Sequence, residues 1–312
     1  MHPDLVKAGE LIDAGDPQGA ARELRARADD LTAGDLAPAV GRLAELVGID
    51  ELAGAAAALA ADPSAPGALY AYGYACIEHG LSGLAVPALR QALAGALRGD
   101  GVPEAKRRLF GRARPAAAAV DPRQVLLELA VALEDGERHD EAVELLREHE
   151  DVTGDWPDRY LLVHNALMAG RLDLAREVFA RLSAPDDTWR PAADRIRRTL
   201  ARADAVPPAG PADLRGWHHV LTGGLLATLS PFGYDAGMTG RWAYLQGGWG
   251  DCRLGLERLR AVLAATGRRP PPSRCCPTGA AGRSAWPPPN CSACPRPRTG
   301  PARPTRWWSR TT

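Results

Sequence analysis

The stretch that decides the fold runs from residue 126 to residue 148 and reads LLELAVALEDGERHDEAVELLRE. An apolar segment ends at Gly136, and in the segment that follows, Ala142 precedes Leu146 by four residues. Apolar residues in both segments recur every three or four positions, which is the period of an α-helix with one buried face. Because glycine readily adopts the left-handed backbone that ends many helices, the stretch predicts two antiparallel helices joined at Gly136.

The same pattern recurs elsewhere in the chain, with the small residue and then the large apolar residue at fixed distances after the glycine. A small alanine lets the second helix approach the first, and the large residue four positions later fills the space between them. The 126–148 stretch has one extra residue in its turn, and Gly136 and Gly170 are 34 residues apart. The other three stretches are residues 5–27 (Gly15, Ala20, Leu24), residues 69–93 (Gly80, Ala85, Leu89) and residues 160–182 (Gly170, Ala175, Phe179).

These four stretches resemble tetratricopeptide repeats. Tyr72 and Gly73 match the Leu-Gly pair in the first helix of that family, and Ala92 matches its last small position. The resemblance implies an all-α fold of antiparallel helical hairpins stacked as an α-solenoid, with a groove that binds a peptide or helix of another protein. Longer spacings between the other glycines leave room for degenerate hairpins, for which residues 51–63 and 103–120 are candidates. The alternative is a general all-α bundle with short loops.

Composition changes along the chain predict four regions. All 38 acidic residues lie within residues 1–257, together with only 27 of the 38 basic residues. After Glu257 the chain contains eleven arginines and no acidic residue. The predicted regions are a helical repeat array over 1–204, a linker over 205–215, a glycine-rich helical start of a second, truncated domain over 216–268, and a disordered tail rich in proline and arginine over 269–312.

The charge and the apolar pattern also bear on which partners and which cellular location are expected. A body with an excess of acidic residues disfavours nucleic acid as a partner. No apolar run reaches the roughly 18–20 residues that cross a bilayer, and the charged N-terminus does not read as a signal peptide, so a cytoplasmic protein is expected. Arginine replaces lysine almost throughout, which is typical of a bacterium with a G+C-rich genome.

Residue types that support catalysis or metal binding do not occur in a suggestive arrangement. His218 and His219 are adjacent, so they cannot share one helix face as a metal-binding pair four residues apart would. Two arginine-rich stretches, at 106–114 and 190–202, contain few aromatic residues and are interpreted as solvated helix faces or contacts for an acidic peptide. We predict no metal site, no cofactor and no catalytic residue in residues 1–257.

The tail holds Cys275, Cys276, Cys291 and Cys294, which a zinc ribbon could use. The segment, however, lacks acidic residues, leucine and any apolar periodicity that could build a core. When the codons of the tail are read one base earlier, residues 275–278 become Leu-Leu-Pro-Asp. The codons of Trp307, Trp308 and Ser309 then give two consecutive valines. The shifted frame thus encodes apolar strands and an amphipathic helix, from which we infer an out-of-frame translation that begins near residues 265–275.

The predicted function is a scaffold or adaptor that binds a partner protein or peptide in the groove of the repeats. The side chains expected to face that groove are Tyr72, Tyr74, His164, Asn165 and Arg171. The alternative is an enzyme, or a regulator of one, whose α/β C-terminal domain has been lost through the frameshift. Nucleic-acid binding would require the acidic body to carry a separate basic face.

Overall fold

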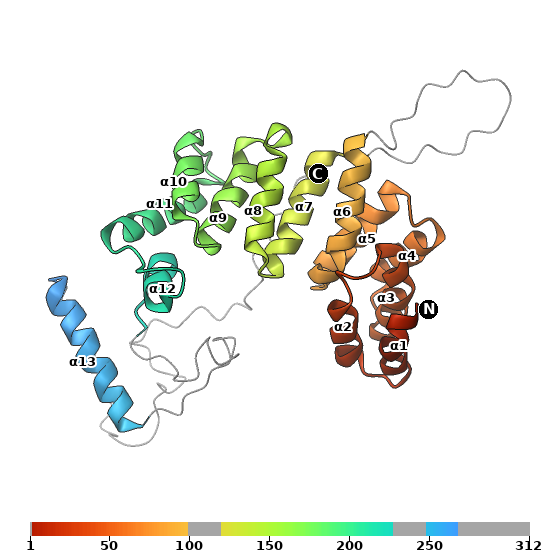
Figure 1. The fold of residues 1–312 in the computed structure, drawn as a ribbon, viewed down its shortest axis with the longest axis horizontal. Coiled ribbons are helices and arrows are strands. Elements are labelled where there is room, and N and C mark those ends of the chain that lie inside the picture. The colour runs from red at the N-terminus through yellow and green to blue at the C-terminus, as the bar shows by residue number, and fades with distance from the viewer. Residues whose placement is uncertain (1, 99–119, 227–247, 268–312) are drawn as a thin grey trace, which may run out of the picture. The chain divides into compact units, whose positions relative to one another are not determined.

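The computed structural model describes residues 2–98, 120–226 and 248–267, and within these ranges every regular element is helical (Figure 1). The predicted all-α class is therefore confirmed. The chain divides into two compact units, Met1–Leu226 and Ala227–Thr312. The helices of the first unit are α1 (Val6–Asp13), α2 (Pro17–Ala26), α3 (Ala33–Val47), α4 (Asp50–Ala61), α5 (Pro66–Glu78), α6 (Ser82–Arg98), α7 (Pro122–Asp135), α8 (His139–Glu148), α9 (Tyr160–Met168), α10 (Leu172–Arg181), α11 (Arg190–Ala205) and α12 (Leu214–Thr222), with short helical turns η1 (Pro3–Leu5), η2 (Glu150–Val152) and η3 (Asp155–Arg159).

Helices that follow one another in the first unit pack in pairs, from α1 with α2 to α11 with α12. The second helix of each pair also contacts the first helix of the next pair, and α5 contacts α7 directly. Near the N-terminus the arrangement is less regular, because α6 contacts α2 and α3 as well as its own partner α5. The described part of this unit is thus a series of helical hairpins that share one buried apolar core.

The turns within these hairpins use one backbone geometry. Gly15, Gly80 and Gly170 have φ values of +72°, +72° and +77°. The residue after each of them donates its N–H to a carbonyl five residues back, as Leu81 does to Cys76 at 2.8 Å. This is the hydrogen bond that closes a helix whose next residue is left-handed. Gly48, at +73°, ends α3 in the same way, although the sequence pattern did not single it out.

The 126–148 turn differs from the prediction in one respect. Gly136 has φ −82°, an ordinary value, and the left-handed residue is Glu137, at +59°. The closing hydrogen bond follows Glu137, since Arg138 donates to Leu133 at 2.9 Å. Measured from the left-handed residue, Ala142 lies five positions on, as Ala175 does from Gly170. The predicted extra turn residue is therefore an extra residue before the turn, and the equivalent turns are 33 residues apart.

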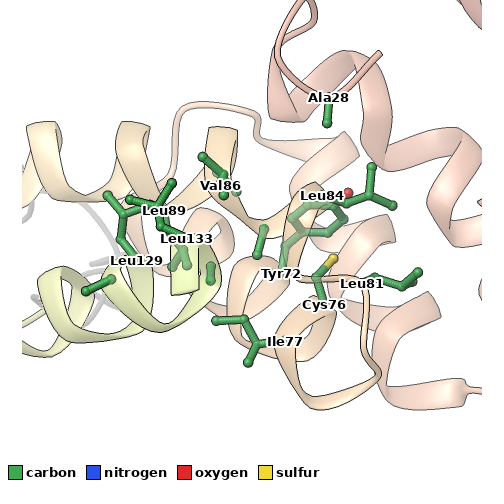
Figure 2. Close-up of a cluster of buried hydrophobic side chains, with 14 of the residues drawn as sticks. Ala28, Tyr72, Cys76, Ile77, Leu81, Leu84, Val86, Leu89, Leu129 and Leu133 are labelled. Atoms are coloured by element: carbon green, nitrogen blue, oxygen red, sulfur yellow. The ribbon is translucent and has the colours of Figure 1, made fainter. Parts of the chain in front are cut away.

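The packing residues of the pattern lie in the core. Ala20, Ala85, Ala142 and Ala175 are fully buried, as are Leu24 and Leu89, and Leu146 is 1% exposed. A Cβ atom on Gly73 would lie 2.6 Å from Cγ of Leu89, so only glycine lets α5 and α6 approach this closely. Phe179 is half-buried at the edge of this core. Figure 2 shows side chains of α5, α6 and α7 in one such buried cluster.

Two stretches that the sequence marked as candidate hairpins have different outcomes. Residues 51–63 form most of α4, which pairs with α3. Of residues 103–120, only Val120 lies in the described part of the chain.

The end of the first unit lies beyond the predicted array boundary at residue 204. Helix α12 packs against α11, where Arg202 donates to the carbonyls of Val220 and Leu221 at 2.8 and 3.1 Å. Asp213 caps α12 by accepting from the N–H of Gly216 at 2.9 Å. The unit therefore includes the predicted linker 205–215 and continues to Leu226.

In the second unit the structure describes residues 248–267, which contain one helix, α13 (Trp249–Ala265). The glycine-rich residues 227–247 and the tail 268–312, to which the frameshift prediction applies, lie outside the described residues. Among the helices that are described, none has the length and apolar composition to span a membrane.

Candidate protein-binding surface

Three side chains of α5 lie in one row because they are four residues apart. They are Tyr70, Tyr74 and Glu78, all half-buried, whereas Tyr72 and Cys76 on the other side of the helix are buried. The rings of Tyr70 and Tyr74 stack with centroids 6.2 Å apart. Residues four apart on a helix are neighbours on its surface, so this row presents two aromatic rings followed by a carboxylate.

Glu128 of α7 lies beside this row. Burial and, to a smaller extent, the negative charge of Glu78 together raise the pKa of Glu128 from 4.5 to about 7. Burial also raises the pKa of Tyr70, and the charge of Glu128 adds to that effect. The two helices thus bring a stacked tyrosine pair next to two carboxyl groups, one of which is only partly ionised at neutral pH.

A polar network joins α7 to α9 a little farther along. The amide of Asn165 donates to Glu134 and to the carbonyl of Leu161, both at 3.0 Å, and its oxygen lies 2.9 Å from Nδ1 of His139. His164 Nε2 lies 3.4 Å from the other oxygen of Glu134. Burial opposes the charge of Glu134, but the hydrogen bonds from His164 and Asn165, together with the charges of His164 and His139, outweigh it and lower the pKa of Glu134.

An aromatic cluster continues this surface at the start of α9. The Tyr160 ring lies 6.0 Å from that of Trp156, 5.6 Å from that of Trp189 and 6.2 Å from that of His164. The indole N–H of Trp156 donates to the carbonyl of Ser183 at 3.1 Å. The cluster places several half-buried aromatic rings around a single helix end.

The turn that carries Trp156 is fixed by an ion pair between a buried carboxylate and an exposed arginine. Arg123 of α7 binds both carboxylate oxygens of Asp158, at 2.6 and 2.9 Å, and the N–H of Gly154 also donates to Asp158 at 2.7 Å. Asp158 is fully buried. A paired, hydrogen-bonded carboxylate in the interior holds its loop in one conformation, so α7 positions the aromatic cluster of the next hairpin.

We call the combined surface the first-helix face, because it lies on the first helices of three consecutive hairpins. It is defined by Tyr70, Tyr74 and Glu78 of α5, Glu128 and Glu134 of α7, and Tyr160 and His164 of α9. Glu128, Val131 and Glu134 follow one another at intervals of three residues on α7 and are all half-buried. They therefore form one stripe along this helix. Aromatic faces and carboxylates both attract a guanidinium or ammonium group, so the residues of the first-helix face have chemistry that suits cationic groups.

The five groove residues expected from the sequence divide into three groups. Tyr74 and His164 lie on the first-helix face. Asn165 is fully buried, so its predicted position facing the groove is wrong, and its amide donates to Glu134 instead. Tyr72 is also fully buried, so its predicted position facing the groove is corrected to a core position. Arg171 pairs with Glu144 of α8, which is not among the residues that define this face.

Sequence reasoning missed Tyr70, Glu128, Glu134 and the aromatic cluster. The four-residue spacing of Tyr70, Tyr74 and Glu78 was a usable signal. The match of Tyr72 to a packing position of the repeat family was a second signal, because it already placed the opposite side of the helix in the core. Nothing local, in contrast, indicates that Glu134 meets a histidine and an asparagine thirty residues later.

The chain was compared with protein-family models, with curated proteins and with solved structures, and none of them matches it. Within the described residues no group of three or more histidine, cysteine, aspartate or glutamate side chains could hold a metal ion.

Proposed function

We propose that the protein is an interaction adaptor of the tetratricopeptide-like kind, whose first-helix face binds a cationic segment of a partner protein. The observation that carries this proposal is the position of Glu128 beside the stacked pair of Tyr70 and Tyr74. Burial and Glu78 both oppose the negative charge of Glu128. An arginine of a partner would reverse that effect, because its guanidinium can stack on a tyrosine ring while it binds a carboxylate.

The aromatic cluster around Tyr160 extends the same surface and supplies contact area for apolar side chains of the partner. Tyrosine and tryptophan are enriched among residues that dominate binding energies, since each offers a large rigid surface. Met168 at the end of α9 adds a flexible apolar side chain that is 42% exposed. A peptide or helix that combines arginine with an aromatic or aliphatic residue fits this surface best.

The test is selection of binding peptides from a random displayed library on the full-length protein. We expect sequences enriched in arginine next to an apolar residue. The affinity of a selected peptide should fall about tenfold or more in Tyr74→Ser and in Glu128→Gln at pH 8, which corresponds to at least about 1.4 kcal/mol. Glu148→Gln, an exposed change on α8, is the matched control and should stay within about twofold.

Two results would contradict the proposal. One is a selection that enriches no cationic sequence. The other is a set of selected peptides whose affinity is the same for Tyr74→Ser, Glu128→Gln and the control variant.

A further inference from the structure

A second surface feature of the first unit lies among α2, the junction of α3 and α4, and the turn between α5 and α6. It is an open groove with a volume of about 530 Å³. Its floor is formed by apolar side chains, including Leu43, Val47, Ile49 and Leu81. Val47 is 44% exposed and Ile49 is half-buried, so the floor leaves apolar surface in contact with solvent.

The rim of the groove is cationic. Arg22 and Arg25 are three residues apart on α2 and both line the groove. His79, which follows α5, also lines it, and its Nε2 lies 3.9 Å from a carboxylate oxygen of Glu51, so the positive charge of the rim comes from the two arginines. Arg25 donates to the carbonyl of Gly80 at 3.2 Å and, among the residues that the structure describes, pairs with no carboxylate. Within the described residues Arg22 has neither an ion pair nor a hydrogen bond.

Most of the other arginine side chains in the first unit differ from Arg22 and Arg25, because they pair with a carboxylate. Arg42 pairs with Asp13, Arg90 with Glu141 at 2.6 Å, and Arg138 with Asp29 at 2.8 Å. In a body with an excess of acidic residues, two neighbouring arginines without a carboxylate at the edge of an apolar groove form a locally positive site. Such a site attracts an acidic ligand and opposes a basic one.

We infer that this groove docks an acidic segment of a second partner protein. One large apolar side chain of that segment would cover Val47 and Ile49, while flanking carboxylates pair with Arg22 and Arg25. The charge argues against the chain's own C-terminal residues as the occupant, because they contain eleven arginines and no acid after Glu257. This inference goes beyond the proposed function, since it concerns another surface and a partner of opposite charge.

Isoleucine methyl groups provide a direct test, because the chain has four isoleucines and only Ile49 lines the groove. The full-length protein, labelled at the isoleucine δ1 methyl groups, is titrated with blocked peptides of four glutamates around a central leucine, phenylalanine or tryptophan. Matched peptides with lysine in place of glutamate are the charge controls. Ile49 should shift with saturation by at least one acidic peptide, while Ile196 of α11 should not move.

Arg22→Glu should weaken this binding at least about fivefold, and Arg27→Glu should leave it within about twofold. Both arginines are exposed, and Arg27 is not among the residues that line the groove, so the two variants differ in position and not in charge change. Unshifted signals of Ile12, Ile77 and Ile196 in each variant report an intact fold.

The inference is overturned if no acidic peptide moves Ile49 at millimolar concentration, if lysine peptides move it equally, or if Arg22→Glu binds like the control. It is also overturned if the protein dimerises and Arg22→Glu abolishes the dimer, because the occupant would then be a second copy. None of these results bears on Tyr74→Ser and Glu128→Gln, so the proposed function is judged separately.

Discussion

Helices α5 and α6 meet through apolar contacts, and we call this contact the apolar seam. Helices α7 and α9 are joined through the hydrogen bonds of Asn165 and Glu134, and we call this contact the polar seam. In the first, Gly73 lets Leu89 approach the backbone of α5, and buried Tyr72 and Cys76 complete the packing. In the second, Asn165 is buried but joins three helices through polar atoms. The same hairpin design thus gives a tight structural seam in one place and, in the other, a polar seam that supports surface groups able to contact a partner.

The largest effect that would test this difference is expected at the apolar seam. Gly73→Val places a side chain within 2.6 Å of Cγ of Leu89, so the Leu89 side chain or the helices must shift. We expect the free energy of unfolding to fall by about 3 kcal/mol. Gly67→Val, in the same helix with no atom within 4 Å of the new Cβ, should change it by less than about 0.5 kcal/mol in urea denaturation. Equal effects of the two variants would show that α5 and α6 are not packed in this way.

The next effect compares one buried polar group from each seam. Asn165→Leu removes hydrogen bonds to Glu134 and to the Leu161 carbonyl and should destabilise the protein by about 2–3 kcal/mol. Tyr72→Phe should change the stability by less than about 0.5 kcal/mol, because the only polar neighbour of the buried Tyr72 hydroxyl among the described residues is the Cys76 thiol, a weak hydrogen-bond partner. Thermal unfolding of both variants measures the difference, and the opposite order would refute the contrast between the seams.

A smaller effect depends on pH and concerns Glu128 at the edge of the face. The folded pKa of Glu128 is raised from 4.5 to about 7, so folding favours its protonated form. The resulting stability is complete below about pH 4.5 and is lost as the pH rises through about 7. Glu128→Gln should therefore stabilise the protein by about 2 kcal/mol at pH 8 and hardly at all at pH 5. A stabilisation that does not change between these pH values would exclude this cause.

The smallest effects distinguish the two kinds of turn. Gly80→Ala forces an alanine to φ +72° and should cost about 1 kcal/mol, whereas Gly136→Ala, at φ −82°, should cost less than half of that. Glu137→Gly should stabilise the protein by up to about 1 kcal/mol, since it relieves a left-handed glutamate. Equal losses of stability in Gly80→Ala and Gly136→Ala would show that Gly136, and not Glu137, is the left-handed residue, as the sequence pattern predicted.

The sequence could predict the helical class and most hairpins because glycine, alanine and leucine at fixed offsets report local packing. It could not decide between Gly136 and Glu137 as the left-handed residue, since the choice depends on which helix gains one residue. The α3–α4 hairpin was less visible, because α4 is mostly alanine and has few large residues to set a pattern. The site was harder still. Tyr74 and His164 were found as exposed polar or aromatic residues, but the partners of His164 and Asn165 come from other hairpins and are determined only by tertiary packing.

The most direct test of the central claim, that the first-helix face binds a cationic segment, is the pH dependence of peptide affinity. A selected peptide whose only ionisable side chains are arginines is titrated by calorimetry at pH 6 and pH 8. We predict that the wild-type protein binds it several-fold more tightly at pH 8, because Glu128 is then ionised, and that Glu128→Gln binds weakly with little pH dependence. The same affinity and the same pH dependence in both proteins would contradict the account.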